Sequence, residues 1–460
     1  MKVLKFGGTS VGTVESLRNV KGIVESLDEP AIVVVSALGG LTDKLIATAR
    51  GAADGSVDHR AEMAAIRARH QHIIDTLVPG QLRDSVTGRV NAMLNELANL
   101  YLGVSLINEL PPKTLDRIVS FGERMSSVIV AAIIDGAEHR DSLEFIKTER
   151  WHDRNIADRR TIETKVREQF GLPLKNHVVT GGFIARDRDT DTITNLGRGG
   201  SDFTAALIAS ALDADSLEIW TDVDGFMTAD PRIIPDARVI PHMTFVESME
   251  LCLFGAKVIY PPTIYPVFNK NIPIRILNTH NPAAPGTLIT DNSAELPTTV
   301  RGVSSVRGIA MLTLTGQVTS NFPEVNSRTF NAMARAGIDV LLVTHDDESR
   351  SYSISLKESD APKAAEILRT EFAPELSSGD LKGISADTGM AVLAVVREGV
   401  RKLSGLGTRL LNTLTREGID VLGLSDGASE ATVAAVVNDQ DIIRALQLVH
   451  DSVIKSSPAK

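Results

Sequence analysis

The last third of the chain repeats itself, and this repeat restricts the possible folds more than any other feature of the sequence. The sequence Gly-Ile-Asp-Val-Leu occurs at Gly337–Leu341 and again at Gly418–Leu422, an offset of 81 residues. The same offset pairs Asn331 with Asn412. Agreement at one offset over a long stretch indicates two copies of one supersecondary unit.

Each copy is expected to contain the same order of elements, strand, helix, strand, strand and helix. The expected ranges are 310–315, 327–336, 339–344 and 351–356 in the first copy, and 391–396, 407–417, 420–425 and 431–437 in the second, each followed by a helix. Such a unit forms a small open sheet with its helices on one side. The copies either only hold subunits together or bind a regulatory ligand at their interface; we favour the second interpretation.

The preceding part of the chain alternates short apolar runs with longer amphipathic stretches. Continuous β-branched runs are typical of strands buried on both faces of a parallel sheet, so an α/β domain with helices on both sides is expected. The runs are Val3–Phe6, Ala31–Val35, His177–Val179 and Leu217–Trp220, and two of the helical stretches are Glu62–Leu77 and Phe203–Leu212. The stretch Asn278–Pro297 is rich in Pro, Asn and Thr and is interpreted as the linker to the repeats.

Composition narrows the class of protein. The 460 residues are enough for two to four domains at roughly 100–200 residues each. Lys and Arg number 48 against 58 Asp and Glu, a net charge of −10, which argues against a protein that coats nucleic acid or anionic membrane. The single cysteine, Cys252, excludes an intramolecular disulfide and a multi-cysteine metal site. No signal-like or membrane-spanning stretch is visible, so we expect a cytoplasmic protein.

Two glycine-rich segments have the character of anion sites. Lys5-Phe6-Gly7-Gly8-Thr9-Ser10 lies between an expected strand and an expected helix, where backbone amides and a helix N-terminus attract negative charge. Its lysine precedes the glycines, so the segment is not a P-loop. The alternative is a plain tight turn.

The second segment is Gly197-Arg198-Gly199-Gly200-Ser201-Asp202, which opens the helix near Phe203. The planar guanidinium of Arg198 suits a carboxylate or a phosphate. The alternative for Asp202 is an N-cap. Two such segments in one α/β domain are less common than one, which strengthens the functional interpretation.

Further polar residues follow expected strands or open helices. Asp222 and Asp224 lie at the carboxyl end of a strand, where they suit a metal or a nucleotide, or form an ordinary polar turn. Lys257, in Phe-Gly-Ala-Lys, either reaches a phosphate or is a surface lysine. Glu123 is placed near a helix start, where the helix dipole favours a carboxylate in any case. Ser36–Thr42 is another turn of small and hydroxylated residues.

Taken in this order, the segments resemble aspartate kinases of the amino acid kinase family. The motifs that carry the resemblance are Lys-Phe-Gly-Gly-Thr-Ser, Ser-Phe-Gly-Glu, Gly-Arg-Gly-Gly-Ser-Asp, Trp-Thr-Asp-Val-Asp-Gly, Thr-Ala-Asp-Pro-Arg and Phe-Gly-Ala-Lys-Val. The repeat resembles the tandem ferredoxin-like ACT domains of these enzymes. The likeness is strongest to the aspartokinase half of bifunctional aspartokinase–homoserine dehydrogenases; no dehydrogenase region follows the second copy, so a monofunctional enzyme is expected.

The resemblance implies a catalytic domain over residues 1–292 and ACT domains over 305–384 and 385–460, interlocked so that the C-terminal end completes the first. It implies transfer of a phosphoryl group from ATP to L-aspartate, giving 4-phospho-L-aspartate, the first step toward lysine, threonine and methionine. Mg²⁺ would be bound mainly through phosphate oxygens and water. Feedback by lysine or threonine and a homodimer or homotetramer formed through the ACT domains are also implied.

The resemblance also implies roles for individual residues. The catalytic residues would be Lys5, Lys257 and Asp202, and the ATP site would be Lys5, Gly7, Gly8, Ser201, Thr221, Asp222, Asp230, Arg232 and Lys257. The aspartate site would be Ser36, Thr42, Glu123 and Arg198, where Glu123 would bind the ammonium and Arg198 the α-carboxylate of the substrate. The effector site would be Ser320, Asn321 and Asp339. No catalytic His or Cys is expected, because the aspartate side chain is already ionised at pH 7.

The chain departs from the family pattern at a few positions. Met227 replaces a tyrosine that relatives often carry, and Tyr260 stands where histidine is usual. The turn after the first strand of the first copy lacks the glycines of threonine-sensitive relatives, so the effector is left open. Two other functions stay open at this point: another kinase of the same fold, and a non-catalytic amino-acid sensor.

Overall fold

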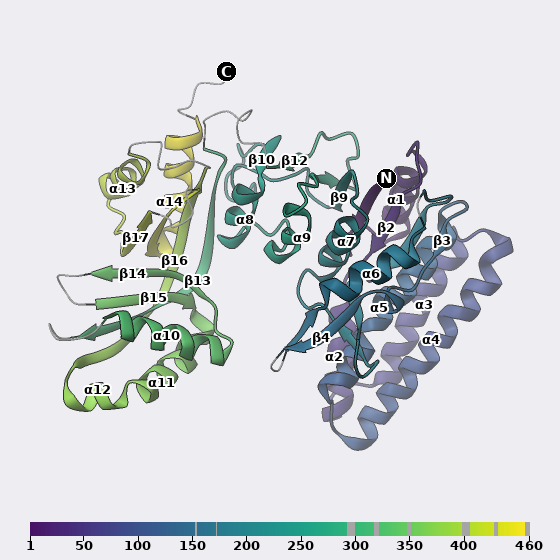
Figure 1. Ribbon diagram of the computed structural model, residues 1–460, viewed down its shortest axis with the longest axis horizontal. Coiled ribbons are helices and arrows are strands. Elements are labelled where there is room, and N and C mark those ends of the chain that lie inside the picture. The colour runs from purple at the N-terminus through teal and green to yellow at the C-terminus, as the bar shows by residue number, and fades with distance from the viewer. Residues whose placement is uncertain are drawn as a thin grey trace. The chain divides into compact units, whose positions relative to one another are not determined.

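The chain forms two compact units in the computed structural model (Figure 1). The structure describes residues 1–151, 154–171, 173–291, 300–316, 322–346, 351–397, 405–426 and 431–455. The first unit contains 1–226, 239–245 and 257–294, and the second contains 227–238, 246–256 and 295–460.

The first unit is built on an eight-stranded sheet with the order β10-β12-β11-β9-β1-β2-β6-β3. All neighbouring pairs are parallel except β11 with β12. The strands are β1 (Lys2–Phe6), β2 (Ile32–Val35), β3 (Glu138–His139), β6 (Val178–Gly181), β9 (Ser216–Thr221), β10 (His242–Thr244), β11 (Ile274–Asn278) and β12 (Thr287–Thr290). The four apolar runs predicted as strands are confirmed as β1, β2, β6 and β9. The predicted linker is wrong in part, because it contains β12, an integral strand of this sheet.

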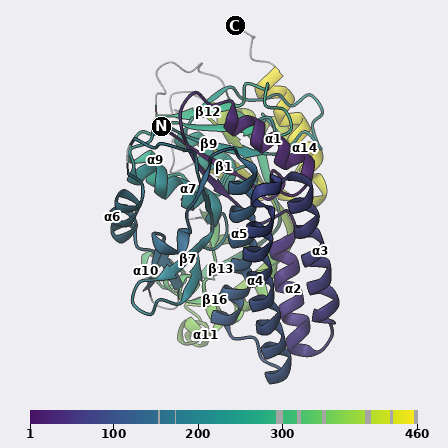
Figure 2. The same cartoon turned by 90° about the vertical axis from the view of Figure 1, so that its right-hand side faces the viewer.

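Helices cover both faces of this sheet, as the alternating pattern predicted. Leu4, Phe6, Val33 and Val35 share one core with residues of the first five helices, and Figure 2 shows α2 to α5 packed side by side. Helix α7 contacts β1, β2 and β9, with Ala205, Ala206 and Ala209 among its buried residues. The helices of this unit are α1 (Val14–Glu25), α2 (Leu41–Asp54), α3 (His59–Leu77), α4 (Gly80–Ile107), α5 (Pro112–Ile133), α6 (Arg159–Gln169), α7 (Gly200–Ala211) and α9 (Tyr265–Phe268); all of α8 (Phe245–Leu253) except Phe245 belongs to the second unit.

A smaller four-stranded sheet lies within the first unit, with the order β5-β4-β7-β8. Its strands are β4 (Lys147–Trp151), β5 (Arg154–Ala157), β7 (Ile184–Asp187) and β8 (Ile193–Asn195). The β7–β8 hairpin leads directly into the glycine-rich segment that precedes α7.

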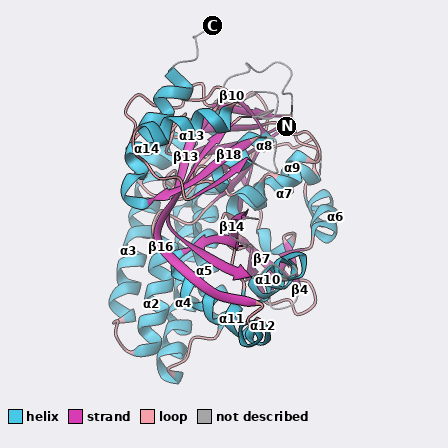
Figure 3. Cartoon of the chain, turned by 90° about the vertical axis from the view of Figure 1, so that its left-hand side faces the viewer, coloured by secondary structure: helices cyan, strands magenta, loops and turns pink. Residues whose placement is uncertain are grey.

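The second unit contains a six-stranded antiparallel sheet with the order β14-β15-β13-β16-β18-β17, whose long strands are visible in Figure 3. The elements predicted from the repeat are confirmed, but the first strand of each copy begins well before its predicted range of 310–315 or 391–396. The strands are β13 (Gly302–Gly316), β14 (Val340–Asp346), β15 (Ser351–Lys357), β16 (Leu381–Val396), β17 (Gly423–Asp426) and β18 (Thr432–Asn438), and the helices are α10 (Phe322–Ala336), α11 (Ala361–Glu371), α12 (Ala373–Ser378), α13 (Leu406–Arg416) and α14 (Ile442–His450).

Strands β13 and β16 pass through both halves of this sheet. Each has a glycine with positive φ near its middle, Gly308 (+67°) and Gly389 (+73°), and their pairing register shifts there. A glycine in this conformation lets a strand bend at a bulge. Residues 302–307, which precede the first copy, pair with the second half of β16. A segment before the first copy therefore pairs with the second, and the expected completion of the first copy by the C-terminal end stays a prediction.

The second unit also incorporates two segments from the middle of the chain. Ala229 and Ile234 belong to the core of the second copy, together with residues of α13 and α14. Glu247, on α8, accepts hydrogen bonds from Arg301 Nε at 3.0 and 3.1 Å, with both residues buried. In the part of the chain that the structure describes, no helix is long and apolar enough to cross a membrane.

Candidate active site

A cavity of about 260 Å³ lies at the carboxyl ends of β1 and β2, beside the start of α7. This edge is where open α/β sheets bind their ligands. Phe183 and glycines form part of its wall. The sequence-predicted residues that line it are Lys5, Ser36, Thr42, Glu123, Arg198, Ser201 and Asp202. Residues from five separate stretches of the chain thus meet around one space.

Lys5 reaches the cavity because of the strand period. Side chains alternate between the faces of a strand, and Leu4 and Phe6 face the core with α1 to α5, so Lys5 faces α7. Its Nζ lies 2.6 Å from Asp202 Oδ1, and both side chains are about nine-tenths buried, with 11% and 12% exposed. Gly199 occupies the N-cap of α7, so the N-cap alternative for Asp202 is wrong. Asp202 lies in the first turn, where the helix dipole stabilises its charge.

The loops after β1 and β2 approach each other backbone to backbone. A Cβ on Gly39 would lie 2.9 Å from the carbonyl oxygen of Gly8, and one on Gly12 would lie 3.0 Å from the same atom. Glycine is therefore required by this contact. The amide of Gly7 donates to the carbonyl oxygen of Trp220 at 3.2 Å, so this amide is already engaged by the protein itself. Gly7 and Gly8 are thus packed against the cavity edge but do not line it.

Arg69, on α3, joins these two loops and was missed by the sequence analysis. Its Nη2 donates to the carbonyl oxygens of Gly12 at 2.8 Å and Gly39 at 2.9 Å. Burial lowers the pKa of its guanidinium. A single arginine in an amphipathic helix has no sequence signature, so only the tertiary structure identifies this contact.

Glu123 is the most deeply buried carboxylate that lines the cavity, with 3% of its surface exposed. It lies in the middle of α5, not near a helix start, so the helix-dipole explanation is wrong. Its Oε1 accepts a hydrogen bond from the amide of Ala37 at 3.0 Å, whereas Oε2 is buried without a hydrogen-bond partner among the described residues. Burial raises the pKa of this carboxyl to about 8, against the partial compensation of the Ala37 amide. The unpartnered oxygen suits a cationic ligand group.

Ser36 and Thr42 complete this side of the cavity. The carbonyl oxygen of Ser36 accepts a hydrogen bond from Ser126 Oγ at 2.7 Å, and the Ser36 amide donates to Phe6 at 3.1 Å. Thr42 lies in the first turn of α2. Helix α5 therefore fixes the loop after β2 from two positions, through Glu123 and through Ser126.

The loop that carries Arg198 needs its glycines. Gly197 and Gly199 have φ values of +73° and +67°, which residues other than glycine rarely adopt. A Cβ on Gly199 would lie 2.3 Å from Cβ of Tyr260, so the tyrosine that departs from the family pattern packs on this loop. The Arg198 side chain is exposed where it lines the cavity. It is free to move onto a ligand.

Phe183, another residue that the sequence analysis missed, lines the same cavity with a φ of +64°. Its amide donates to Thr204 Oγ1 on α7 at 3.0 Å. A non-glycine residue in this conformation is strained and is held only by its surroundings. The hydrogen bond to α7 fixes the turn between β6 and β7 against the start of that helix.

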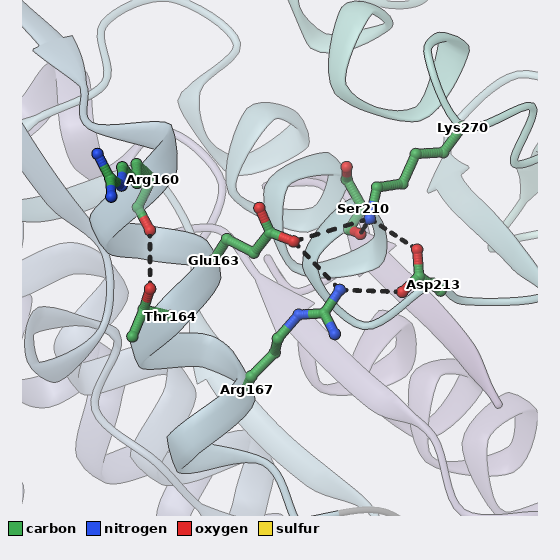
Figure 4. Close-up of polar contacts among 7 residues, drawn as sticks. All are labelled: Arg160, Glu163, Thr164, Arg167, Ser210, Asp213 and Lys270. Atoms are coloured by element: carbon green, nitrogen blue, oxygen red, sulfur yellow. Dashed lines mark hydrogen bonds and ion pairs between the residues drawn. The ribbon is translucent and has the colours of Figure 1, made fainter.

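A network of charged side chains anchors the other end of α7 (Figure 4). Arg167 and Lys270 both bind Asp213, at 3.0 and 2.6 Å, and Lys270 also donates to the carbonyl oxygen of Ser210 at 2.6 Å. Arg167 binds Glu163 on the same helix, α6, at 3.1 Å. These groups are largely exposed, so each pair contributes little alone, but together they link α6, α7 and the segment after α9.

The remaining candidates lie outside this cavity. Thr221 ends β9, and its hydroxyl donates to Asp222 at 3.2 Å. Lys257 is exposed and does not line the cavity. Asp230 and Arg232 belong to the second unit, where Arg232 Nε lies 2.9 Å from Asp230 Oδ1. Asp339 is exposed just before β14.

Ser320 and Asn321, the other two predicted effector residues, lie outside the described residues. The structure therefore places only Asp339 of the three. The effector site stays a prediction.

Comparison with known proteins gives the family. The model of the amino acid kinase family matches residues 1–278, more than half of the chain, and a model described as an ACT domain matches residues 393–453. The chain belongs to the amino acid kinase family. The fold class predicted from the sequence is thereby confirmed.

Relatives of this amino acid kinase are similar over almost its whole length. It is 32% identical to a bifunctional aspartokinase/homoserine dehydrogenase of Haemophilus influenzae, over 99% of this chain and 57% of the relative. It spans about half the length of the first bifunctional relatives, 50–57%.

Two solved structures extend the likeness to the fold. E. coli aspartokinase III in complex with aspartate and ADP matches with a TM-score of 0.83 and 28% identity, over 98% of this chain and 99% of that one. The same enzyme in complex with lysine and aspartate gives a TM-score of 0.76 at 28% identity, over 99% of each chain.

Proposed function

We propose that this protein is an aspartate kinase, which transfers the γ-phosphoryl group of ATP to the side-chain carboxylate of L-aspartate. One observation carries the proposal: a single cavity contains the buried, unpartnered oxygen of Glu123, the exposed guanidinium of Arg198 and the ammonium of Lys5. These are a partner for an α-ammonium, a partner for an α-carboxylate and a cation for transferred phosphate. The aspartokinases among the relatives support it.

The arrangement suggests an orientation for the substrate. An α-ammonium on Glu123 Oε2 would give this oxygen the partner that it lacks and would return the carboxyl to its ionised form. The guanidinium of Arg198 would then hold the α-carboxylate through two parallel hydrogen bonds. The side-chain carboxylate would extend toward Lys5 and the first turn of α7. Ser36 and Thr42 would donate hydroxyl hydrogen bonds along the way.

The reaction needs no general base, because the attacking carboxylate is already ionised. An oxygen of that carboxylate forms a bond to the γ-phosphorus as the bond to the β-phosphate oxygen breaks, and ADP leaves. The barrier comes from bringing two anions together, so fixed positive charge supplies most of the catalysis. Lys5, the amides at the start of α7 and Lys257 would supply it, with Asp202 positioning Lys5 through their ion pair.

The nucleotide side of the proposal rests on residues of the loop after β1, the start of α7, the end of β9 and the segment that follows β9. Gly7, Gly8 and Ser201 would lie along the phosphates, and Thr221, Asp222, Asp230 and Arg232 would border the nucleotide. Among the described residues, no group of three or more His, Cys, Asp or Glu side chains gathers in a way that could hold a metal ion. In this proposal Mg²⁺ enters with ATP and would be held chiefly by phosphate oxygens and water. Bound in that way, Mg²⁺ would neutralise charge on the triphosphate.

Regulation through the repeats is part of the same proposal. The second copy matches an ACT-domain model, and a relative was solved with lysine bound. Lysine or threonine would bind near Ser320, Asn321 and Asp339, and the repeats would join two or four chains. Domains over 1–292, 305–384 and 385–460 and a cytoplasmic location belong to this proposal.

An initial-rate assay of ADP release tests the function. L-Aspartate should support turnover with ATP and Mg²⁺, whereas L-glutamate, N-acetylglutamate and UMP should not. Turnover with one of the latter and none with aspartate would reject the proposal. The same assay with lysine, threonine and methionine identifies the effector.

A further inference from the structure

A second and larger cavity in the first unit shares no lining residue with the candidate active site. Its volume is about 520 Å³, and it is bounded by α4, by α5, by the segment before β4 and by the β7–β8 hairpin. Four of its lining residues are cations, Lys113, Arg117, Arg124 and Arg186, and three are acids, Glu96, Asp141 and Asp191. Leu100, Leu143 and Ile193 add apolar surface.

The charges in this cavity are incompletely paired. Arg117 Nη2 lies 2.5 Å from Glu96, and Arg186 Nη1 lies 2.8 Å from Asp191. Arg124 Nη1 and Arg186 Nε are nevertheless buried without a hydrogen-bond partner among the described residues. Buried guanidinium nitrogens without a partner are costly, and a native protein normally satisfies them.

The surroundings of these two nitrogens favour an anion. The guanidinium of Arg124 lies 4.7 Å from the centre of the Phe121 ring, a contact that holds its plane without satisfying its N–H groups. The pKa of Lys147, next to the hairpin, is lowered by burial and then by the charge of Arg186. The charge of Asp191 acts on Lys147 in the opposite direction, so the case for an anion rests on the two unpartnered nitrogens.

We propose that this cavity binds a small organic anion, whose carboxylate or phosphate is held by Arg124 and Arg186 and whose apolar part contacts Leu100, Leu143 and Ile193. Both anionic groups match the fork of donors on a guanidinium. The volume is enough for a metabolite-sized molecule.

The cavity shares two elements with the substrate site. Arg124 directly follows Glu123 on α5. Strand β8 runs from Ile193 in the cavity wall to Asn195, whose Nδ2 donates to Asp116 on α5 at 2.7 Å and whose Oδ1 accepts from the amide of Gly197 at 2.9 Å. A ligand that fixes the hairpin against α5 thus also fixes the loop of Arg198. Occupancy is expected to change the aspartate KM, a consequence that rests on the proposed function, whereas binding itself does not.

Calorimetry on the full chain tests binding, with inorganic phosphate, phenyl phosphate and phenylacetate as probes. Inorganic phosphate carries only the anionic group, whereas the other two probes add an apolar ring, so the set distinguishes the contributions of the two parts. Phenyl phosphate or phenylacetate should bind more tightly than inorganic phosphate. Arg124→Gln and Arg186→Gln should each weaken this binding about 10- to 100-fold, the loss of a hydrogen bond to a charged group. Arg18→Gln, which removes an exposed arginine of α1 that does not line the cavity, is the control and should change little.

The variant Lys5→Met distinguishes this cavity from the substrate site, because it removes a cation that lines the substrate site and not this cavity. Probe binding should survive in Lys5→Met. No binding of any probe, or binding that is lost in Lys5→Met but kept in Arg124→Gln, would overturn the proposal. If Arg124→Gln fails to fold, Arg124→Lys keeps the charge and should retain only part of the binding.

Discussion

Each unit has one buried ion pair with a further buried charged group in excess near it, and these two groups behave differently. In the first unit, Lys5 pairs with Asp202 while Glu123 lacks a cationic partner among the described residues. In the second unit, Arg301 and Arg397 lie buried near one carboxylate, Glu247, and Arg397 Nη1 has no hydrogen-bond partner in the described chain. Burial, and then the charge of Arg301, lowers the pKa of Arg397.

The difference comes from the chemistry of the two groups. A buried carboxyl can bind a proton and become neutral, which the raised pKa of Glu123, about 8, indicates at neutral pH. An arginine stays charged under all physiological conditions. The excess in the first unit is therefore a reversible charge beside a cavity, suited to a ligand, whereas the excess in the second is a permanent charge that lowers stability.

Removing the buried carboxylate of Glu247 should destabilise the second unit strongly. Glu247→Gln leaves two buried arginines without their counter-charge and should lower the free energy of unfolding by about 3–5 kcal/mol. Denaturant titration measures the effect. Arg397→Met is the matched variant with the opposite sign, since it removes the excess and should raise stability by about 1 kcal/mol. Equal losses in the two variants would mean that the arginine is not in excess.

Lys5→Met should affect chemistry rather than stability. Loss of a fixed cation beside the transferred phosphoryl group should lower kcat about 10²- to 10³-fold, with little change in the aspartate KM. Steady-state ADP release checks both parameters. Lys21→Met, which removes a partly exposed lysine on α1, is the control and should retain full activity. An unchanged kcat in Lys5→Met would place Lys5 outside the reaction.

Arg198→Gln should weaken substrate binding. Because its guanidinium is proposed to hold the α-carboxylate, the aspartate KM should rise about 10- to 100-fold while kcat changes less. Arg18→Gln, an exposed arginine of α1, should leave KM as it is. If Arg198→Gln saturates with aspartate like the unaltered protein, another residue holds that carboxylate.

The pH dependence of the aspartate KM should report Glu123. Only the ionised carboxylate of Glu123 attracts the substrate ammonium, and the pKa of Glu123 in the protein without substrate is about 8. KM should therefore fall about tenfold for each pH unit between pH 6 and 8 and level off above pH 8. Initial rates across this range measure it. Glu123→Gln should bind aspartate weakly and without this slope; a slope that persists in the variant assigns the titration elsewhere.

Local sequence patterns predicted the elements well, because the period of apolar residues follows the faces that each element buries. The four buried strands of the first unit and the matching elements of the repeat are of this kind. Tertiary relations were harder: β12 was hidden in a segment rich in proline, and Glu123 was assigned to a helix start although it lies in the middle of α5. The contacts of Arg69 with two loops have no local signal at all.

The path of the chain has a consequence for recombination. Segments 227–238 and 246–256 fold with the repeats although they lie in the middle of the kinase sequence. A chimera joined in the region around residue 292 would combine these two segments from one parent with repeats from another, so Ala229 and Ile234 would meet foreign partners. A chimera that also exchanges the two segments would take the whole second unit from one parent, so its native packing would be kept. Any difference in effector response between the parents could then be assigned to one complete folding unit.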